Sequence, residues 1–139
     1  MRKSLLLLGA LVLLISLVIG CQSMTQSGVK SSSHQNMNGG GIQVRIKKAN
    51  GGSTEEIEVE GVGSGVVLDS DVTISVETGS FKIELLDADD EVTLALEARD
   101  GETVSGSGDM AVDSFGEATY RVTAVEASNV EYSIDYTFR

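Results

Sequence analysis

From residue 42 to the end of the chain, apolar and polar residues alternate. The alternation is clearest at the C-terminus, where the apolar members are Val130, Tyr132, Ile134, Tyr136 and Phe138. A period of two places successive side chains on opposite faces of a β-strand, so the pattern predicts strands with one buried face. The chain shows no 3.6-residue helical period, which predicts an all-β domain.

Turn-forming residues interrupt the alternation at roughly ten-residue spacing. They are Asn50-Gly51-Gly52, Asp69-Ser70-Asp71, Thr78-Gly79-Ser80, Asp87 to Asp90, and Asp100-Gly101. The last is typical of a type I′ hairpin turn, because Asp and Gly tolerate positive φ. Residues 42–139 are therefore predicted to form about eight or nine short strands in a single antiparallel β-sandwich, jelly-roll or immunoglobulin-like, with a small barrel as the alternative.

The charge of the chain is strongly negative. Its 21 Asp and Glu residues all lie at or after Glu55, against 10 Lys and Arg residues in the whole sequence. Such a surface repels nucleic acid and anionic lipid, so the sequence predicts no nucleic-acid partner and a folded part that stands off any bilayer.

The N-terminal residues have the pattern of a targeting segment. The basic residues Arg2 and Lys3 precede an uncharged run from Leu5 to Gly20. As a helix this run would be roughly 24 Å long, shorter than the roughly 30 Å hydrocarbon core of a bilayer. Residues 1–20 are therefore predicted to be a signal peptide.

Val18-Ile19-Gly20-Cys21 resembles the lipobox of bacterial lipoproteins. The resemblance implies cleavage between Gly20 and Cys21, diacylglycerol on the Cys21 thiol, and a fatty acyl group such as palmitate on the new amino group. It also implies a lipid-anchored chain in the cell envelope, on the outer membrane of a Gram-negative host and otherwise on the outer face of the cytoplasmic membrane. Cys21 is the one cysteine, so it cannot form a disulfide within the chain.

The segment after Cys21 has almost no apolar content and ends in three glycines. Such a composition cannot bury enough surface to offset the ordering of its backbone. Residues 21–41 are therefore predicted to be the lipidated cysteine and a flexible tether, with His34 as a solvated tether residue.

Catalytic and cofactor chemistry finds little support in the sequence. The predicted domain of residues 42–139 has no histidine or cysteine, which disfavours Ser-His-Asp or Cys-His catalysis and a zinc site. Gly61, Gly63 and Gly65 are not followed by a helical pattern, so they predict a bend and not a phosphate loop. No catalytic residue and no cofactor are predicted, and a carboxylate-based envelope hydrolase is the remaining enzymatic alternative.

Clustered acids leave calcium as an alternative ligand. Asp87, Asp89, Asp90 and Glu91 lie in one predicted turn, and Ca²⁺ binds six to eight oxygen ligands. The sequence does not follow the spaced EF-hand loop, and aspartates in turns commonly bond their own backbone instead. A calcium site at this turn and a plain turn without a ligand are therefore two alternatives.

The stretches FKIELLDADDEVTLALEA and GEATYRVTAVEASNVEYSIDYTF are similar to small β-sandwich modules that follow bacterial secreted peptidases. This resemblance implies the fold and no site. The sequence as a whole predicts a lipid-anchored envelope protein that presents an acidic β-sandwich to an envelope protein or polymer. A calcium- or cation-binding module is the alternative, and a hydrolase is less favoured.

Overall fold

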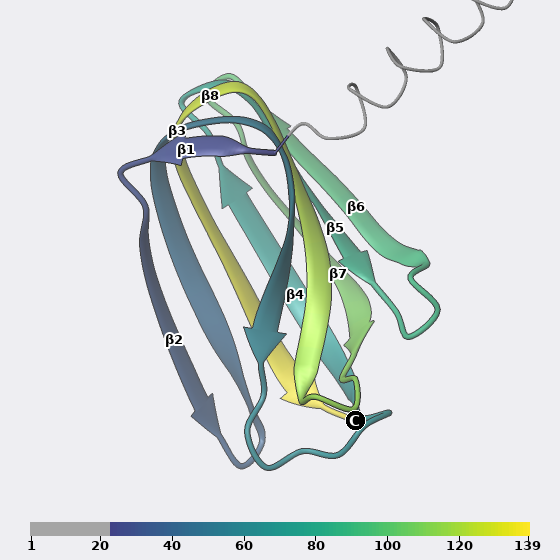
Figure 1. Cartoon of the computed structure of the whole chain (residues 1–139). Coiled ribbons are helices and arrows are strands. Elements are labelled where there is room, and N and C mark those ends of the chain that lie inside the picture. The colour runs from purple at the N-terminus through teal and green to yellow at the C-terminus, as the bar shows by residue number, and fades with distance from the viewer. Residues whose placement is uncertain (1–22) are drawn as a thin grey trace, which may run out of the picture.

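The computed structural model describes residues 23–139 and shows an all-β domain (Figure 1). Its strands are β1 (Thr25–Ser27), β2 (Lys30–Asn36), β3 (Gly39–Glu58), β4 (Val67–Ser75), β5 (Thr78–Leu86), β6 (Val92–Arg99), β7 (Thr103–Ala111) and β8 (Glu117–Phe138). All ladders between these strands are antiparallel, as predicted. Within residues 23–139, no helix has the length and apolar character needed to cross a membrane. The predicted signal peptide, the Gly20–Cys21 cleavage site and the lipidation of Cys21 lie outside the described residues.

Strands β3 and β8 are much longer than the short strands predicted, at 20 and 22 residues. They pair along their whole length, with one register shift between Ala49 and Gly51. Gly51 has a φ of 101°, and Glu126 and Asn129 on β8 have φ values of 43° and 46°. A bulge with positive φ bends a strand without ending it. The turn predicted at residues 50–52 is therefore a bend within a continuous ladder and not a chain reversal.

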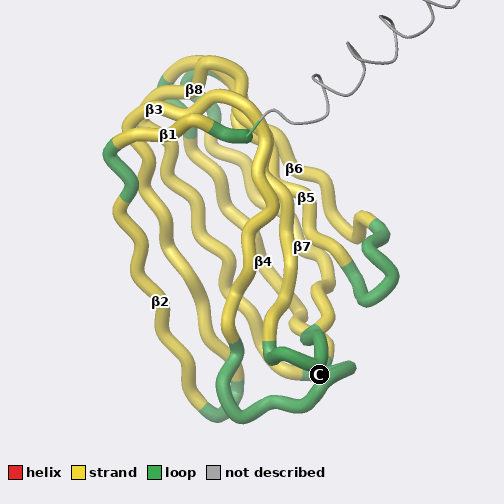
Figure 2. Tube along the Cα trace, viewed as in Figure 1, coloured by secondary structure: helices red, strands yellow, loops and turns green. Residues whose placement is uncertain are grey.

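The bend folds the sheet into two layers. The C-terminal half of β8 pairs with β4, and its N-terminal half pairs with β5. The first layer is therefore β2, the first half of β3, the second half of β8, β4 and β7; the second layer is the remaining halves of β3 and β8 with β5 and β6. Figure 2 shows the short loops at the two ends of these layers. No backbone ladder joins β6 to β7 among the described strands, so the domain is a sandwich and not a closed barrel.

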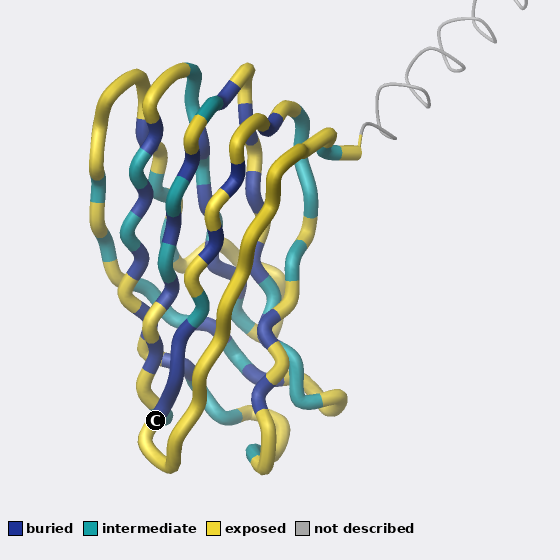
Figure 3. Tube along the Cα trace, turned by 90° about the vertical axis from the view of Figure 1, so that its left-hand side faces the viewer, coloured by how far each residue is buried: buried dark blue, intermediate teal, exposed yellow. Residues whose placement is uncertain are grey.

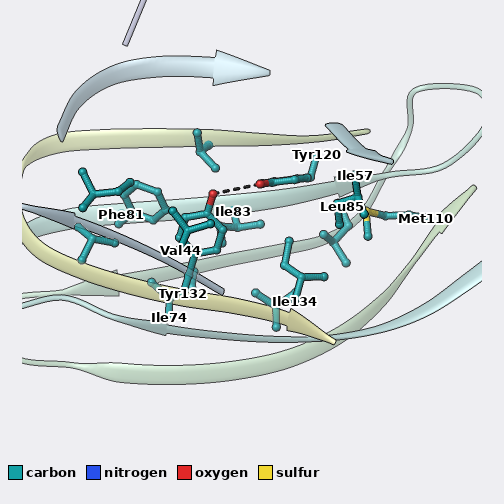
Figure 4. Close-up of a cluster of buried hydrophobic side chains, with 14 of the residues drawn as sticks. Val44, Ile57, Ile74, Phe81, Ile83, Leu85, Met110, Tyr120, Tyr132 and Ile134 are labelled. Atoms are coloured by element: carbon teal, nitrogen blue, oxygen red, sulfur yellow. Dashed lines mark hydrogen bonds between the residues drawn. The ribbon is translucent and has the colours of Figure 1, made fainter. Parts of the chain in front are cut away.

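The inward side chains of both layers form one hydrophobic core (Figure 4). The largest fully buried members include Phe81, Leu68, Ile74, Ile83, Leu85, Met110 and Ile134. Phe81 of the second layer stacks on Tyr132 of the first, with ring centroids 5.4 Å apart. The alternation predicted Tyr132 and Ile134 as inward residues, and both are buried.

The flexible tether predicted for residues 21–41 does not hold where β1, β2 and the start of β3 lie. β2 pairs with β3 from Lys30, opposite Arg45, to Asn36, opposite Gly39. All seven β2 residues are exposed, because no strand of the second layer lies opposite them. Figure 3 shows this exposed strand crossing the face of the domain that lies on the left in Figure 1. Backbone hydrogen bonds and not apolar burial hold β2, so composition alone could not reveal it.

Candidate functional site

A groove lies on the outward face of the first layer, over β4, β7 and the end of β8. Its volume is about 510 Å³. We call it the acidic groove and define it by Asp69, Asp71, Ser107, Asp109, Asp135 and Thr137. Three strands contribute its four carboxylates.

Strand register assembles the acidic groove. Asp71 on β4 lies opposite Asp135 on β8 and Ser107 on β7. Asp69, two residues earlier, lies opposite Thr137 and Asp109 in the same two ladders. Residues two apart share a sheet face, and like charges directly opposite each other destabilise a sheet. The arrangement therefore costs stability that the fold must recover elsewhere.

Arg139 pairs with two of the four carboxylates of this cluster. Its guanidinium lies 2.9 Å from Asp69 Oδ1 and 2.8 Å from Asp109 Oδ2. The hydrogen bond to Asp109 and the two negative charges raise the pKa of Arg139 above its ordinary value. The three side chains are about half exposed, so each pair contributes little net stability. The single positive charge of Arg139 leaves the groove net negative.

Asp71 and Asp135 are the two carboxylates of the groove that Arg139 does not contact. The Ser107 hydroxyl donates a hydrogen bond of 2.6 Å to Asp71 Oδ1. Among residues 23–139, no ion pair involves Asp71 or Asp135. This pair is therefore the part of the groove with charge available to a ligand.

His34 lies on β2 and not in a tether, so the folded domain does contain a histidine. In the sheet it is opposite Gly41, which is opposite Asp135 on its other side. A Cβ at Gly41 would overlap Asp135 Oδ1 and lie 2.9 Å from His34 Cε1, so both side chains lean over this glycine. The imidazole makes no side-chain hydrogen bond within the described part of the chain, and no Ser-His-Asp triad is assembled there.

The Asp87–Glu91 turn, for which a calcium site is the alternative to a plain turn, is closed by hydrogen bonds to its own backbone. Asp87 Oδ1 accepts hydrogen bonds from the backbone N–H groups of Asp89 and Glu91, at 2.9 and 3.0 Å. Asp113 Oδ1 does the same for Phe115 and Glu117, at 2.8 and 3.0 Å. In both turns the Asp is followed four residues later by a Glu, from whose backbone N–H it accepts a hydrogen bond. Within residues 23–139, no group of three or more His, Cys, Asp or Glu side chains is placed to hold a metal ion.

No family model matches the chain, and no curated protein does. Solved structures with a similar arrangement include the CBM22-1 xylan-binding domain from Paenibacillus barcinonensis Xyn10C, at 14% identity over 86% of each chain and a TM-score of 0.38. The carbohydrate-binding module CBM6cm-2 from Cellvibrio mixtus lichenase 5A, in complex with cellotriose, has 15% identity over 81% of this chain and 88% of its own, with a TM-score of 0.36. A Bacillus endospore appendage protein has 12% identity over 84% of this chain and 95% of its own, with a TM-score of 0.42. At such low scores, no ligand and no site passes from these proteins to this chain.

Proposed function

We propose that this chain is a lipid-anchored module of the cell envelope that binds a cationic partner in the acidic groove. The observation that carries the proposal is the Asp71–Asp135 pair, two facing carboxylates without an ion pair among the described residues. A cleft lined by charge of one sign raises the local concentration of counter-charged ligands. Lysine or arginine side chains, or the amino groups of an envelope polymer, have the complementary charge.

The anchor in this proposal is Cys21. The support is the resemblance of Val18-Ile19-Gly20-Cys21 to the lipobox, together with the basic and apolar residues before it. Two or three fatty chains are enough for stable attachment without help from the polypeptide. The anchored domain would lie on the outer membrane of a Gram-negative host, or on the outer face of the cytoplasmic membrane otherwise.

Binding accounts for the groove better than catalysis does. General acid–base or nucleophilic chemistry needs a nucleophile and a base within hydrogen-bond reach of each other. In the described groove the one hydroxyl–carboxylate contact is Ser107 with Asp71, and both are exposed on a sheet face. That contact can orient a ligand.

A neutral glycan is a second candidate ligand, because hydroxyl groups share the groove with the carboxylates. Thr93, Ser107 and Thr137 line it, and both hydroxyls and carboxylates hydrogen-bond sugar hydroxyls. The two ligand classes differ in salt dependence. Binding of a cation weakens as ionic strength rises, whereas hydrogen bonding to a neutral sugar changes little.

The test compares two variants with equal charge change. Asp71→Asn with Asp135→Asn alters the groove, and Asp89→Asn with Asp90→Asn alters an exposed turn. Titration of the domain with a decalysine peptide at low salt should give weaker binding for the groove variant, by about tenfold or more, and wild-type binding for the turn variant. Equal losses in both variants would mean that net charge and not the groove attracts the peptide. Binding only to neutral oligosaccharides, insensitive to salt, would replace the cationic partner with the glycan.

The anchor is tested separately by fractionating cells that produce the wild-type chain or Cys21→Ser. The wild type should sediment with membranes and partition into detergent, and the variant should do neither. A wild-type chain found free of membranes would refute the anchor while leaving the groove experiment intact.

A further inference from the structure

The chain enters the described structure at the bend end of the sandwich. Ser23 forms a bridge with Gly52, and β1 pairs with β3 from Lys48 to Asn50. In the sequence, one residue separates Cys21 from Ser23. Two residues of extended chain span at most about 7 Å, so a lipid on Cys21 would hold the bend end directly at the membrane surface. The separation between the folded domain and the bilayer that a long tether predicts would then be absent.

Basic side chains gather at this end on the β1 side. We call Lys30, Arg45, Lys47 and Lys48 the basic corner. Lys30 lies opposite Arg45 in the β2–β3 ladder, and Lys48 lies opposite Ser27 of β1. A Cβ at Gly28 would lie 2.6 Å from Lys47 Cγ, so the Lys47 stem covers the β1–β2 turn. All four are exposed, and they are half of the eight Lys and Arg residues after Cys21.

Acidic residues at the same end lie mainly in turns other than the β1–β2 turn, and several of their carboxylates accept hydrogen bonds there. Asp100 accepts a hydrogen bond from the Gly79 N–H, and Glu102 from the Arg99 N–H at 3.1 Å. Glu77 is hydrogen-bonded to Asn129. Glu126, on the β8 bend, donates its backbone N–H to Asn50 Oδ1 at 3.1 Å. Glu131, opposite Arg45 in the β3–β8 ladder, forms an exposed ion pair with it at 3.4 Å, so the three lysines carry the free positive charge of the basic corner.

The densest acidic turns lie at the opposite end. The Asp87–Glu91 and Asp113–Glu117 turns follow β5 and β7, whose bend-end residues are Thr78 and Thr103. A nine-residue strand such as β7 is roughly 30 Å long, well beyond the Debye length of about 8 Å at physiological salt. Those acids are screened from a surface that touches the bend end.

A hollow of about 390 Å³ adjoins the basic corner. Its lining includes Lys48, Thr25, Asn50 and Ser128, and one acid, Glu126. A volume in this range accommodates a small polar group, and an ammonium beside hydroxyls suits a phosphate.

We infer that the basic corner is a docking surface for anionic phospholipid headgroups, which sets the orientation of the domain on the membrane. The inference rests on the proposed anchor for its biological setting. Charge complementarity and the entry point of the chain both select the lipid surface as the occupant. With the bend end against the bilayer, the acidic groove on the side of the sandwich stays open to a partner.

The inference can be tested by measuring how fast each of the four lysines after Cys21 is acylated. The chain from Cys21 onward is coupled through its single thiol to a maleimide lipid in vesicles of phosphatidylcholine alone or with phosphatidylglycerol. A water-soluble amine-acylating reagent then labels Lys30, Lys47, Lys48 and Lys82, and mass spectrometry gives each rate. Lys82 is the internal control, because it lies on β5, away from β1, beside Glu84.

On the anionic vesicles, labelling of Lys30, Lys47 and Lys48 should slow by about threefold or more, and Lys82 should keep its rate. In the Lys47→Gln, Lys48→Gln variant, Lys30 should react at the same rate on both kinds of vesicle. Equal rates on both vesicles for the unaltered chain, or equal slowing of all four lysines, would overturn the inference. Chemical coupling replaces the native lipid, so this result does not depend on whether cells lipidate Cys21.

Discussion

Tyr120 and Tyr132 lie twelve residues apart on the same strand, yet their phenolic oxygens are 3.0 Å apart in the core (Figure 4). A straight strand of that length would separate them by roughly 40 Å. The contact exists because β8 bends near Glu126 and Asn129 and places its two halves in opposite layers. This hydrogen bond therefore reports directly on the folding of the sheet over itself.

Single phenylalanine substitutions at this pair should cost more than the double substitution. Tyr120→Phe leaves the Tyr132 hydroxyl buried without its partner, and an unsatisfied buried group costs about 1–3 kcal/mol. Replacing both tyrosines removes both hydroxyls and should be nearly neutral. Urea denaturation of the two single variants and the double variant measures the coupling. Strictly additive losses would show that the two hydroxyls do not interact.

Alkaline pH should destabilise the domain. Burial raises the pKa of Tyr132 to about 12, and burial with the neighbouring Tyr132 raises the pKa of Tyr120 well above its ordinary value of 10. Above pH 10 the unfolded chain loses these phenolic protons and the folded chain keeps them. The free energy of unfolding should then fall by about 1.4 kcal/mol per pH unit for each tyrosine, with no contribution from them at neutral pH.

Thermal melts from pH 8 to pH 11.5 check this slope, and the Tyr120→Phe, Tyr132→Phe double variant is the control. In the double variant, most of the fall in the free energy of unfolding with pH should be absent. Tyr136 should still contribute, because burial raises its pKa too. A decline that is identical in both proteins would contradict the assignment.

Gly79→Ala should destabilise the domain strongly. Gly79 has a φ of 79°, and an added Cβ would overlap the backbone carbonyl oxygen of Glu126. Strained φ costs on the order of 1–3 kcal/mol, and a backbone overlap cannot be relieved by rotating a side chain. Gly63→Ala is the control, since it meets open space and should change stability by less than about 1 kcal/mol. Equal effects in chemical denaturation would mean that β5 does not approach the β8 bend so closely.

β2 should behave as part of the folded domain. Hydrogen exchange should protect about half of the amides of Lys30–Asn36, those that donate to β3. A chain that begins at Gly39, with β3 intact, should be less stable than one that begins at Ser23, by about 2 kcal/mol or more, because it lacks the β1 and β2 ladders to β3. Uniformly fast exchange across β2, with equal stability of the two chains, would instead support the prediction of a flexible tether.

The alternation in the sequence was enough to predict the core but not the course of the sheet. Val130, Tyr132 and Ile134 are predicted as inward residues because apolar residues recur at every second position, and all three are buried. The run KSSSHQN of β2 carries no such signal, since its place depends on pairing with a strand that follows it. The bend at Gly51 has the same local composition as a hairpin turn, and a single sequence does not say which of the two forms.

The acidic groove could not be predicted for a related reason. Asp71, Ser107 and Asp135 come from three strands, and only the register of two ladders brings them together. Each aspartate alone has the appearance of an ordinary exposed strand or turn residue. By contrast, the closed turn at Asp87 follows from local chemistry, because an aspartate in a turn commonly accepts hydrogen bonds from nearby backbone N–H groups.

The most direct test of the account is the intact mass of the native chain extracted from membranes. We predict a polypeptide that starts at Cys21, with a diacylglycerol thioether on its sulfur and at most one further acyl group on its amino end. A chain that still carries residues 1–20, or one that starts at Cys21 with an unmodified thiol, would contradict the account.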